Sequence, residues 1–140
     1  MEYRKFGKTY VVRLDLGENI VESIKKIATK ENIKLAMVNG LGAVDTFELG
    51  IYDVKERKYY RKNFDGHYEI TSLHGSINTM DGEVYTHLHL AVGDHEFKVF
   101  GGHLYEATIG GTGEIFIDEI DGTVDRQKDD KTGINVFKFS

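Results

Sequence analysis

Hydrophobic and polar residues alternate over Tyr10–Leu16, with Arg13 and Asp15 lying between apolar side chains. Alternation of this kind is typical of a strand that buries one face. The period changes over residues 18–31, where apolar side chains recur at helical spacing. Acidic residues lie near the start of that segment and lysines near its end, which favours a helix because both complement the helix dipole. The pattern therefore predicts a strand followed by an amphipathic helix.

Strand-like segments fill most of the chain after this helix. Their apolar residues alternate or form short runs, and turns that often contain glycine separate them. The predicted strands are Lys34–Asn39, a segment around Phe47, Leu49 and Ile51, Arg57–Phe64, Tyr68–Leu73, Val84–Leu90, a segment around Phe97 and Val99, Glu114–Ile120 and Ile134–Phe139. Asp81-Gly82 predicts a tight hairpin turn. We expect an α+β fold with a mostly antiparallel sheet of about seven or eight strands, covered on one face by the one main helix.

Composition limits the classes of protein that the chain can belong to. Its 140 residues are expected to form a single domain over residues 1–140. The absence of cysteine excludes disulfides, thiolate metal ligands and a cysteine nucleophile. No apolar run reaches the roughly 18 residues of a membrane helix, and no apolar segment near the start has the form of a signal peptide. We therefore expect a cytoplasmic protein without a membrane partner, and the net charge of −5 argues against coating DNA through overall charge.

The strongest chemical signal is the His87-Leu88-His89 segment in a predicted strand. Side chains alternate between faces along a strand, so His87 and His89 share one face, with Cβ atoms about 7 Å apart. Two imidazoles at this spacing can converge on one ion through nitrogen–metal bonds of about 2.0–2.1 Å. The alternative is that both histidines belong only to the polar face of an amphipathic strand.

His103 follows Gly101-Gly102 and is the candidate third ligand. A turn at Gly93-Asp94 with regular antiparallel pairing would place His103 opposite Val84, on the wrong face. We therefore expect a one-residue bulge at Gly101-Gly102 that brings His103 onto the histidine face, opposite Tyr85.

Three histidines with a free fourth position are typical of catalytic zinc, and imidazole also binds other divalent transition metals. A cupin-like metal enzyme is one alternative, because cupins also place His-x-His on a strand. Asp94 would then stand where cupins carry a glutamate, and the proline of the second cupin motif is missing.

Six ordered segments together resemble the plant-and-prokaryote-conserved (PPC) domain family, whose bacterial and archaeal members stand alone. They are Gly40–Val44, Leu49–Asp53, Gly66–Ile77, His87–Leu90, Gly101–Leu104 and the stretch around Glu114, and they span nearly the whole chain. The resemblance implies an α/β fold with a mostly antiparallel sheet, assembly as a homotrimer, and a histidine site often described with zinc. By motif match, the ligands would be His87, His89 and His103.

Members of this family are commonly labelled as candidate DNA-binding proteins. In plants the domain follows AT-hooks, which need an Arg-Gly-Arg-Pro core, and the chain holds no proline. A DNA-binding or transcription-associated role would instead use the basic segment 55–62. Its contact residues would be Arg57, Lys58, Arg61 and Lys62, interleaved with two tyrosines. The alternative for this segment is a solvated hairpin.

Other residues bear on catalysis and assembly without deciding either. Glu69 and Glu114 are candidate acid–base partners of the histidine site, against the simpler role of exposed carboxylates on strands. Phe137 and Phe139 lie on one face near the C-terminus and belong either to a subunit interface or to the core. Whether the chain catalyses a reaction, and on which small molecule, stays open at this point.

Overall fold

The computed structural model describes all 140 residues as one helix and eight strands. The elements are β1 (Glu2–Phe6), β2 (Thr9–Leu14), α1 (Ile20–Lys30), β3 (Ala36–Asp53), β4 (Lys58–Met80), β5 (Glu83–Gly93), β6 (Val99–Glu119), β7 (Asp125–Lys128) and β8 (Asn135–Lys138). The large sheet has the strand order β1-β2-β6-β3-β4-β5, and β7 pairs only with β8. All pairings are antiparallel, which confirms the predicted α+β class. No helix has the length and apolar character needed to cross a membrane.

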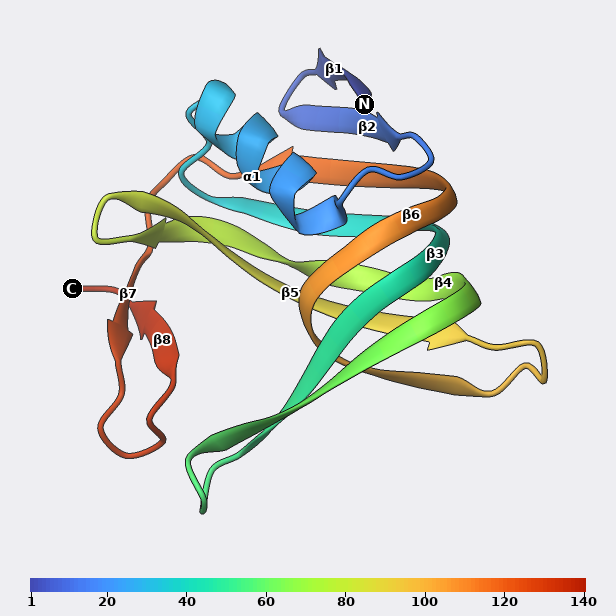
Figure 1. Cartoon of the computed structure of the whole chain (residues 1–140). Coiled ribbons are helices and arrows are strands. Elements are labelled where there is room, and N and C mark those ends of the chain that lie inside the picture. Colours follow the sequence, from blue (N-terminus) through green and yellow to red (C-terminus); the bar gives the residue numbers. More distant parts are fainter.

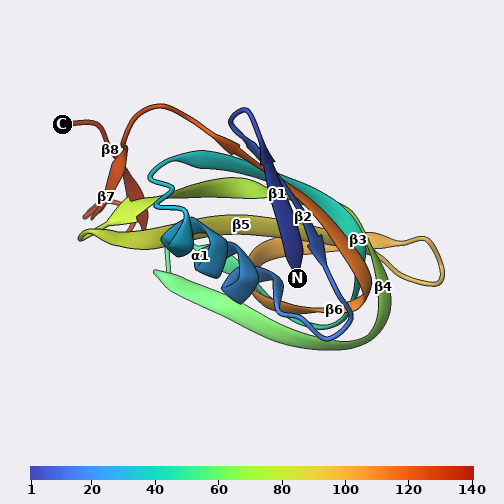
Figure 2. The same cartoon turned by 90° about the horizontal axis from the view of Figure 1, so that it is seen from above.

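A further pairing joins β5 to the first part of β6, so β3, β4, β5 and β6 form a closed ring of strands. Figure 1 shows the resulting curvature, with β6 passing across the sheet and the β7–β8 hairpin standing at one end. Seen from above, the same hairpin lies beside the paired ends of β4 and β5 (Figure 2). This closure brings the first half of β6 alongside β5, and it positions the residues of the candidate site.

The helix covers the inner face of the sheet through the apolar stripe seen in the sequence. Ile20, Ile24 and Ile27 are at most 1% exposed and belong to one core of 25 buried residues. The Asn19 side chain caps the first turn by accepting a hydrogen bond from the Glu22 amide at 3.1 Å. The helix packs on β5 and β6, the two strands that carry the histidines (Figure 2).

Several predicted strands are parts of longer ones. The segments at Lys34–Asn39 and around Phe47 fuse into β3, which stays continuous through two register shifts at Gly40/Gly42 and Val44/Thr46. Gly42 bends the strand rather than ending it: its φ is +143°, and a Cβ there would lie 2.1 Å from the Thr112 carbonyl oxygen. β4 likewise fuses two predicted strands, and Asp81-Gly82 forms the predicted turn with φ values of 53° and 82°.

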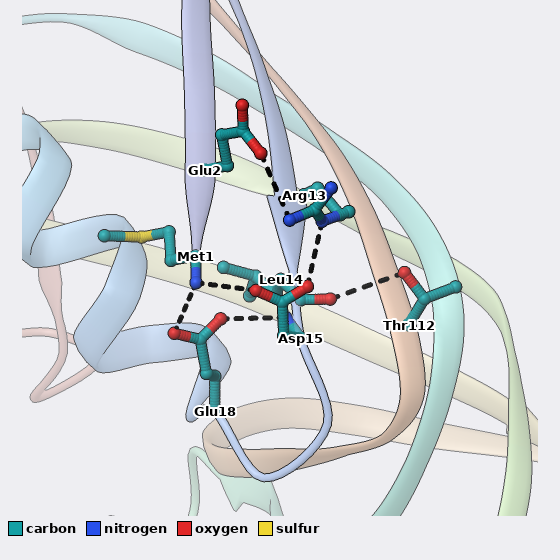
Figure 3. A network of polar contacts seen from close by, with 7 residues as sticks. All are labelled: Met1, Glu2, Arg13, Leu14, Asp15, Glu18 and Thr112. Carbon is teal, nitrogen blue, oxygen red and sulfur yellow. Dashed lines mark hydrogen bonds and ion pairs between the residues drawn. The ribbon is translucent and has the colours of Figure 1, made fainter.

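β1 was not expected from the pattern, because only one of its five residues is even half-buried. It is an edge strand held by β2, and a polar network ties its start to the β2–α1 connection (Figure 3). The Met1 amino group contacts Asp15 Oδ2 at 2.9 Å and Glu18 Oε1 at 2.6 Å. Arg13 Nε also donates to Asp15 at 2.8 Å. These contacts lower the pKa values of Asp15 and Glu18, mainly through their hydrogen bonds to the amino group.

Candidate metal centre

His87 and His89 lie on the outer face of β5, opposite the helix. Leu88 and Leu90 between and after them are each 1% exposed and point into the core, as strand alternation requires. The same outer face continues onto β4, where His74 lies directly across from His89. Their ring centroids are 6.4 Å apart, so a further imidazole borders the pair.

His103 reaches this face by a different route from the one that the sequence predicts. The loop between β5 and β6 begins at Asp94 and runs through Lys98, so Gly93 pairs with Val99 and His103 pairs directly with His89. The pairing of β5 with β6 has no bulge at Gly101-Gly102, and neither Val84 nor Tyr85 faces His103 across the strands. The expected bulge was wrong because the turn is longer than Gly93-Asp94.

The two glycines before His103 serve a different purpose, which is close approach of backbones. A Cβ on Gly101 would lie 2.5 Å from the Leu90 carbonyl oxygen, and one on Gly102 would lie 2.8 Å from the Gly50 carbonyl oxygen. They therefore let β6 pass between β5 and β3. The register shift in β6 lies instead at Tyr105, between the pairs that Glu48 and Leu49 make with β6.

The three predicted ligands converge in the structure. One ligand nitrogen from each of His87, His89 and His103 lies within 4.8 Å of the other two. The ring centroids are 5.2 Å apart for His87 and His89, 5.3 Å for His87 and His103, and 5.8 Å for His89 and His103. No carboxylate belongs to this cluster.

Burial favours the neutral form of all three imidazoles. Burial lowers the pKa of each, and for His103 it lowers the pKa to about 4, with further contributions from His87 and His89. His103 Nδ1 is also the one fully buried side-chain nitrogen or oxygen in the chain without a hydrogen-bond partner. A buried polar atom without a partner is costly, so this nitrogen has a free lone pair or N–H that a ligand could satisfy.

A pocket of about 240 Å³ adjoins His103. It is lined by residues of β4, β5, β6, β8 and the β7–β8 loop: Tyr59, Tyr85, His103, Tyr105, Gly133, Ile134 and Asn135. Burial is the main cause that raises the pKa values of Tyr59 and Tyr105, so both hydroxyls stay protonated. Sequence patterns did not predict a tyrosine pocket, because Tyr59, Tyr85 and Tyr105 lie on three strands that come together only in the folded chain.

Neither carboxylate proposed from the sequence lies in the histidine cluster. Glu69 lines a separate pocket with Asp94 and His95, and Glu114 lies in a groove on the β1–β2–β6 surface. Asp94, the cupin-like candidate, accepts hydrogen bonds from the Glu96 and Lys98 amides inside its own turn. An acid–base role for Glu69 or Glu114 stays a prediction that this chain alone does not support.

The four basic residues proposed as nucleic-acid contacts divide into two pairs. Arg57 donates from Nη2 to the Asp130 carbonyl oxygen at 2.7 Å, and Arg61 forms a two-bond ion pair with Glu48 at 2.6 and 2.9 Å. Lys58 and Lys62 are exposed and lie over the Tyr60 and Phe64 rings. Two of the four are therefore engaged within the chain, and two remain free.

Comparison with known proteins places this geometry in a family. A protein from Bacteroides thetaiotaomicron, named as a candidate DNA-binding protein, is 30% identical with a TM-score of 0.95, covering 99% of this chain and 96% of its own. A metal-containing protein from Archaeoglobus fulgidus is 30% identical with a TM-score of 0.89, covering 98% and 96%. A plant- and prokaryote-conserved protein from Pyrococcus horikoshii is 33% identical with a TM-score of 0.87, covering 98% and 94%.

A search of curated proteins gave no significant match. The family model that matches is the Plants and Prokaryotes Conserved (PCC) domain, over residues 1–121. That range holds the helix, the whole large sheet and all three histidines, and it leaves out the β7–β8 hairpin. The chain therefore belongs to the PCC domain family, the family that its six sequence segments resemble under the name PPC.

Proposed function

We propose that the chain is a metal-binding PCC protein that holds one divalent transition metal, with zinc as the first candidate, on His87, His89 and His103. The observation that carries this proposal is the convergence of three ligand nitrogens within 4.8 Å. The buried, unpartnered Nδ1 of His103 and the lowered pKa values fit it, because a metal binds neutral imidazole. The similar Archaeoglobus protein is named as metal-containing, which agrees with a metal in this family.

The donor set suits a centre with an open position more than a closed structural site. Structural zinc sites use four protein ligands, whereas three histidines are typical of catalytic sites. A bound ion would supply Lewis acidity toward a carbonyl or a water molecule. The chain itself supplies an adjoining pocket that holds three tyrosine side chains, which can position a small ligand by hydrogen bonding.

Metal content of tag-free protein tests the proposal. We expect about one transition metal per chain by mass spectrometry, and none in a His87→Ala/His89→Ala variant. His95→Ala is the matched control, because His95 is an exposed histidine in the β5–β6 loop. Wild-type protein without metal after incubation with zinc would overturn the proposal, as would equal metal in the double variant.

We further propose that the chain assembles as a homotrimer. The family resemblance is the reason for expecting three subunits. An exposed apolar surface supports self-association. The outer face of β1, β2, β3 and β6 carries five apolar side chains that are 38–61% exposed: Phe6, Val11, Met37, Leu41 and Phe116. A surface of this kind is typical of an interface between subunits.

Nucleic-acid binding is a second candidate function. Lys58, Tyr60 and Lys62 alternate along one face of β4 beside an apolar groove of about 390 Å³, and a similar structure is named as a candidate DNA-binding protein. Cations flanking an aromatic ring can bind phosphates and stack a base. Retention of labelled single-stranded and duplex DNA at low salt, lost in Lys58→Gln/Lys62→Gln, would support it. No retention at low salt would exclude it.

A further inference from the structure

Arg126 on β7 is a buried cation that has no acidic partner. It is 6% exposed, and it takes part in none of the ion pairs of the chain. An arginine stays charged at neutral pH, even though burial lowers its pKa here. A buried charge without a counterion is costly, so an anion bound beside Arg126 would be stabilising.

Neutral groups hold the guanidinium of Arg126 in one orientation. Nε donates to Asn78 Oδ1 at 2.9 Å, and Nη1 donates to the Asn135 carbonyl oxygen at 3.0 Å. The guanidinium carbon lies 4.6 Å from the ring centroids of both Tyr85 and Phe137. These contacts fix the plane of the forked guanidinium group without neutralising its charge. The group is therefore pre-organised to bind a planar anion.

Nη2 is the free end of this fork. It makes no hydrogen bond within the chain, and the one fully buried atom without a partner is His103 Nδ1. Nη2 therefore keeps contact with solvent and is open to a ligand.

The Arg126 fork lies next to the histidine cluster. Tyr85, which stacks on the guanidinium, precedes His87 by two residues on the same face of β5, which separates them by roughly 7 Å. Tyr85 and Asn135 also line the 240 Å³ pocket that borders His103. Arg126 does not itself line this pocket. Tyr85 and Asn135 both contact its guanidinium, so the cation adjoins the pocket that borders the histidines.

We propose that Arg126 binds the carboxylate of a small organic acid whose carbon skeleton lies in this pocket. The tyrosine rings and Ile134 offer apolar surface to a carbon skeleton, which an inorganic anion would not use. A second oxygen of the same molecule would reach the histidine centre, and this part alone rests on the proposed metal.

Titration of the full-length, chelator-treated protein with succinate, malonate and pyruvate tests the carboxylate part. We expect saturable binding of at least one acid, weakened tenfold or more by Arg126→Gln and less by Arg126→Lys, which keeps the charge but loses the fork. Lys26→Gln removes an exposed charge on the opposite face and should bind like wild type. Succinamide, which has the same shape without the charges, should not bind.

Three results would overturn the proposal: no saturable binding of any of the acids, equal binding by Arg126→Gln, or binding of inorganic phosphate tighter than that of every carboxylate. The last result would mean a phosphate site. Circular dichroism checks that Arg126→Gln folds. If it does not, the Nε–H resonance of Arg126 in wild-type protein decides, because it must shift during the succinate titration and a fixed resonance refutes the contact.

A second arm separates this proposal from the metal proposal. The His87→Ala/His89→Ala variant should keep the carboxylate binding of the chelator-treated wild type, because Arg126 is intact. Zinc should then tighten binding to wild type and leave the double variant unchanged. Loss of metal content with retained, Arg126-dependent binding would refute the metal centre alone.

Discussion

His89 and His103 face each other directly across β5 and β6, with their ring centroids 5.8 Å apart. This pairing joins two histidines that are fourteen positions apart in the sequence, and His87 completes the cluster from the next outward position of β5. The register of one strand pair therefore decides whether the chain has a three-histidine site. Disturbing that register should affect the site before it affects the rest of the sheet.

Gly101→Ala tests the dependence of the site on backbone approach. The added Cβ would lie 2.5 Å from the Leu90 carbonyl oxygen, a backbone atom that has no room to move. We expect unfolding free energy to fall by about 1–3 kcal/mol and zinc affinity by tenfold or more, because β6 must shift away from β5. Urea unfolding and competition with a zinc indicator measure the two effects.

Gly111→Ala is the matched control, since a Cβ there meets only ordinary contact at 3.5 Å. Zinc affinity within twofold of wild type is expected for the control. Equal affinity in Gly101→Ala would contradict the role assigned to the glycine.

Stability of the metal-free protein should fall as the pH falls from about 6.5 toward 4. Burial lowers the folded-state pKa of His103 to about 4, so in this window the unfolded chain binds a proton that the folded chain does not. Stability rises with pH wherever the unfolded state binds more protons, so it is fully present above the unfolded pKa and lost on acidification. Urea midpoints at pH 7 and pH 5 measure the slope.

His103→Gln should reduce this slope, and His95→Gln in the exposed loop should leave it unchanged. An identical slope in His103→Gln would show that other groups cause the acid sensitivity.

Phe116→Glu should reduce the mass of the assembly. Phe116 is 44% exposed, and Val11 and Asn39 pair with it on the two neighbouring strands, at the centre of the apolar surface. A charge at this position would have to be buried in a subunit interface, which is strongly unfavourable. Light scattering should give a trimer for wild type and for Val54→Glu at the hairpin tip, and a monomer for Phe116→Glu. A monomeric wild type would refute the trimer.

Phe97→Asn should stabilise the chain by about 0.5–1 kcal/mol, because asparagine tolerates the left-handed region better than phenylalanine does. Phe97 has a φ of 61°, which strains its backbone. Its side chain is 92% exposed, so burial of the ring contributes little stability in return. Phe139→Asn, at another exposed phenylalanine, serves as the control and should change stability little. Urea unfolding that gives a lower stability for Phe97→Asn would show that the Phe97 ring has a contact that the isolated chain does not display.

Local pattern determined the features that depend on neighbouring residues. The apolar stripe predicted the helix, Asp81-Gly82 predicted the turn, and alternation placed His87 and His89 on one face. Six ordered segments also indicated the family, which the family model confirms over residues 1–121. These features follow from the periods of helices and strands and from the conformations that glycine and aspartate favour, so a short window of sequence contains them.

Tertiary structure decided the features that depend on register and on distant contacts. The sequence indicated His103 as a ligand, but only the length of the β5–β6 loop placed it opposite His89 without a bulge. β3 remains one strand through its glycines because β4 and β6 pair with it on both sides. No sequence pattern predicted that Arg126 is a buried cation, because Asn78 and Tyr85 surround it only when β7 packs against β4. Contacts of this kind are fixed by the packing of the whole sheet, and no local pattern records them.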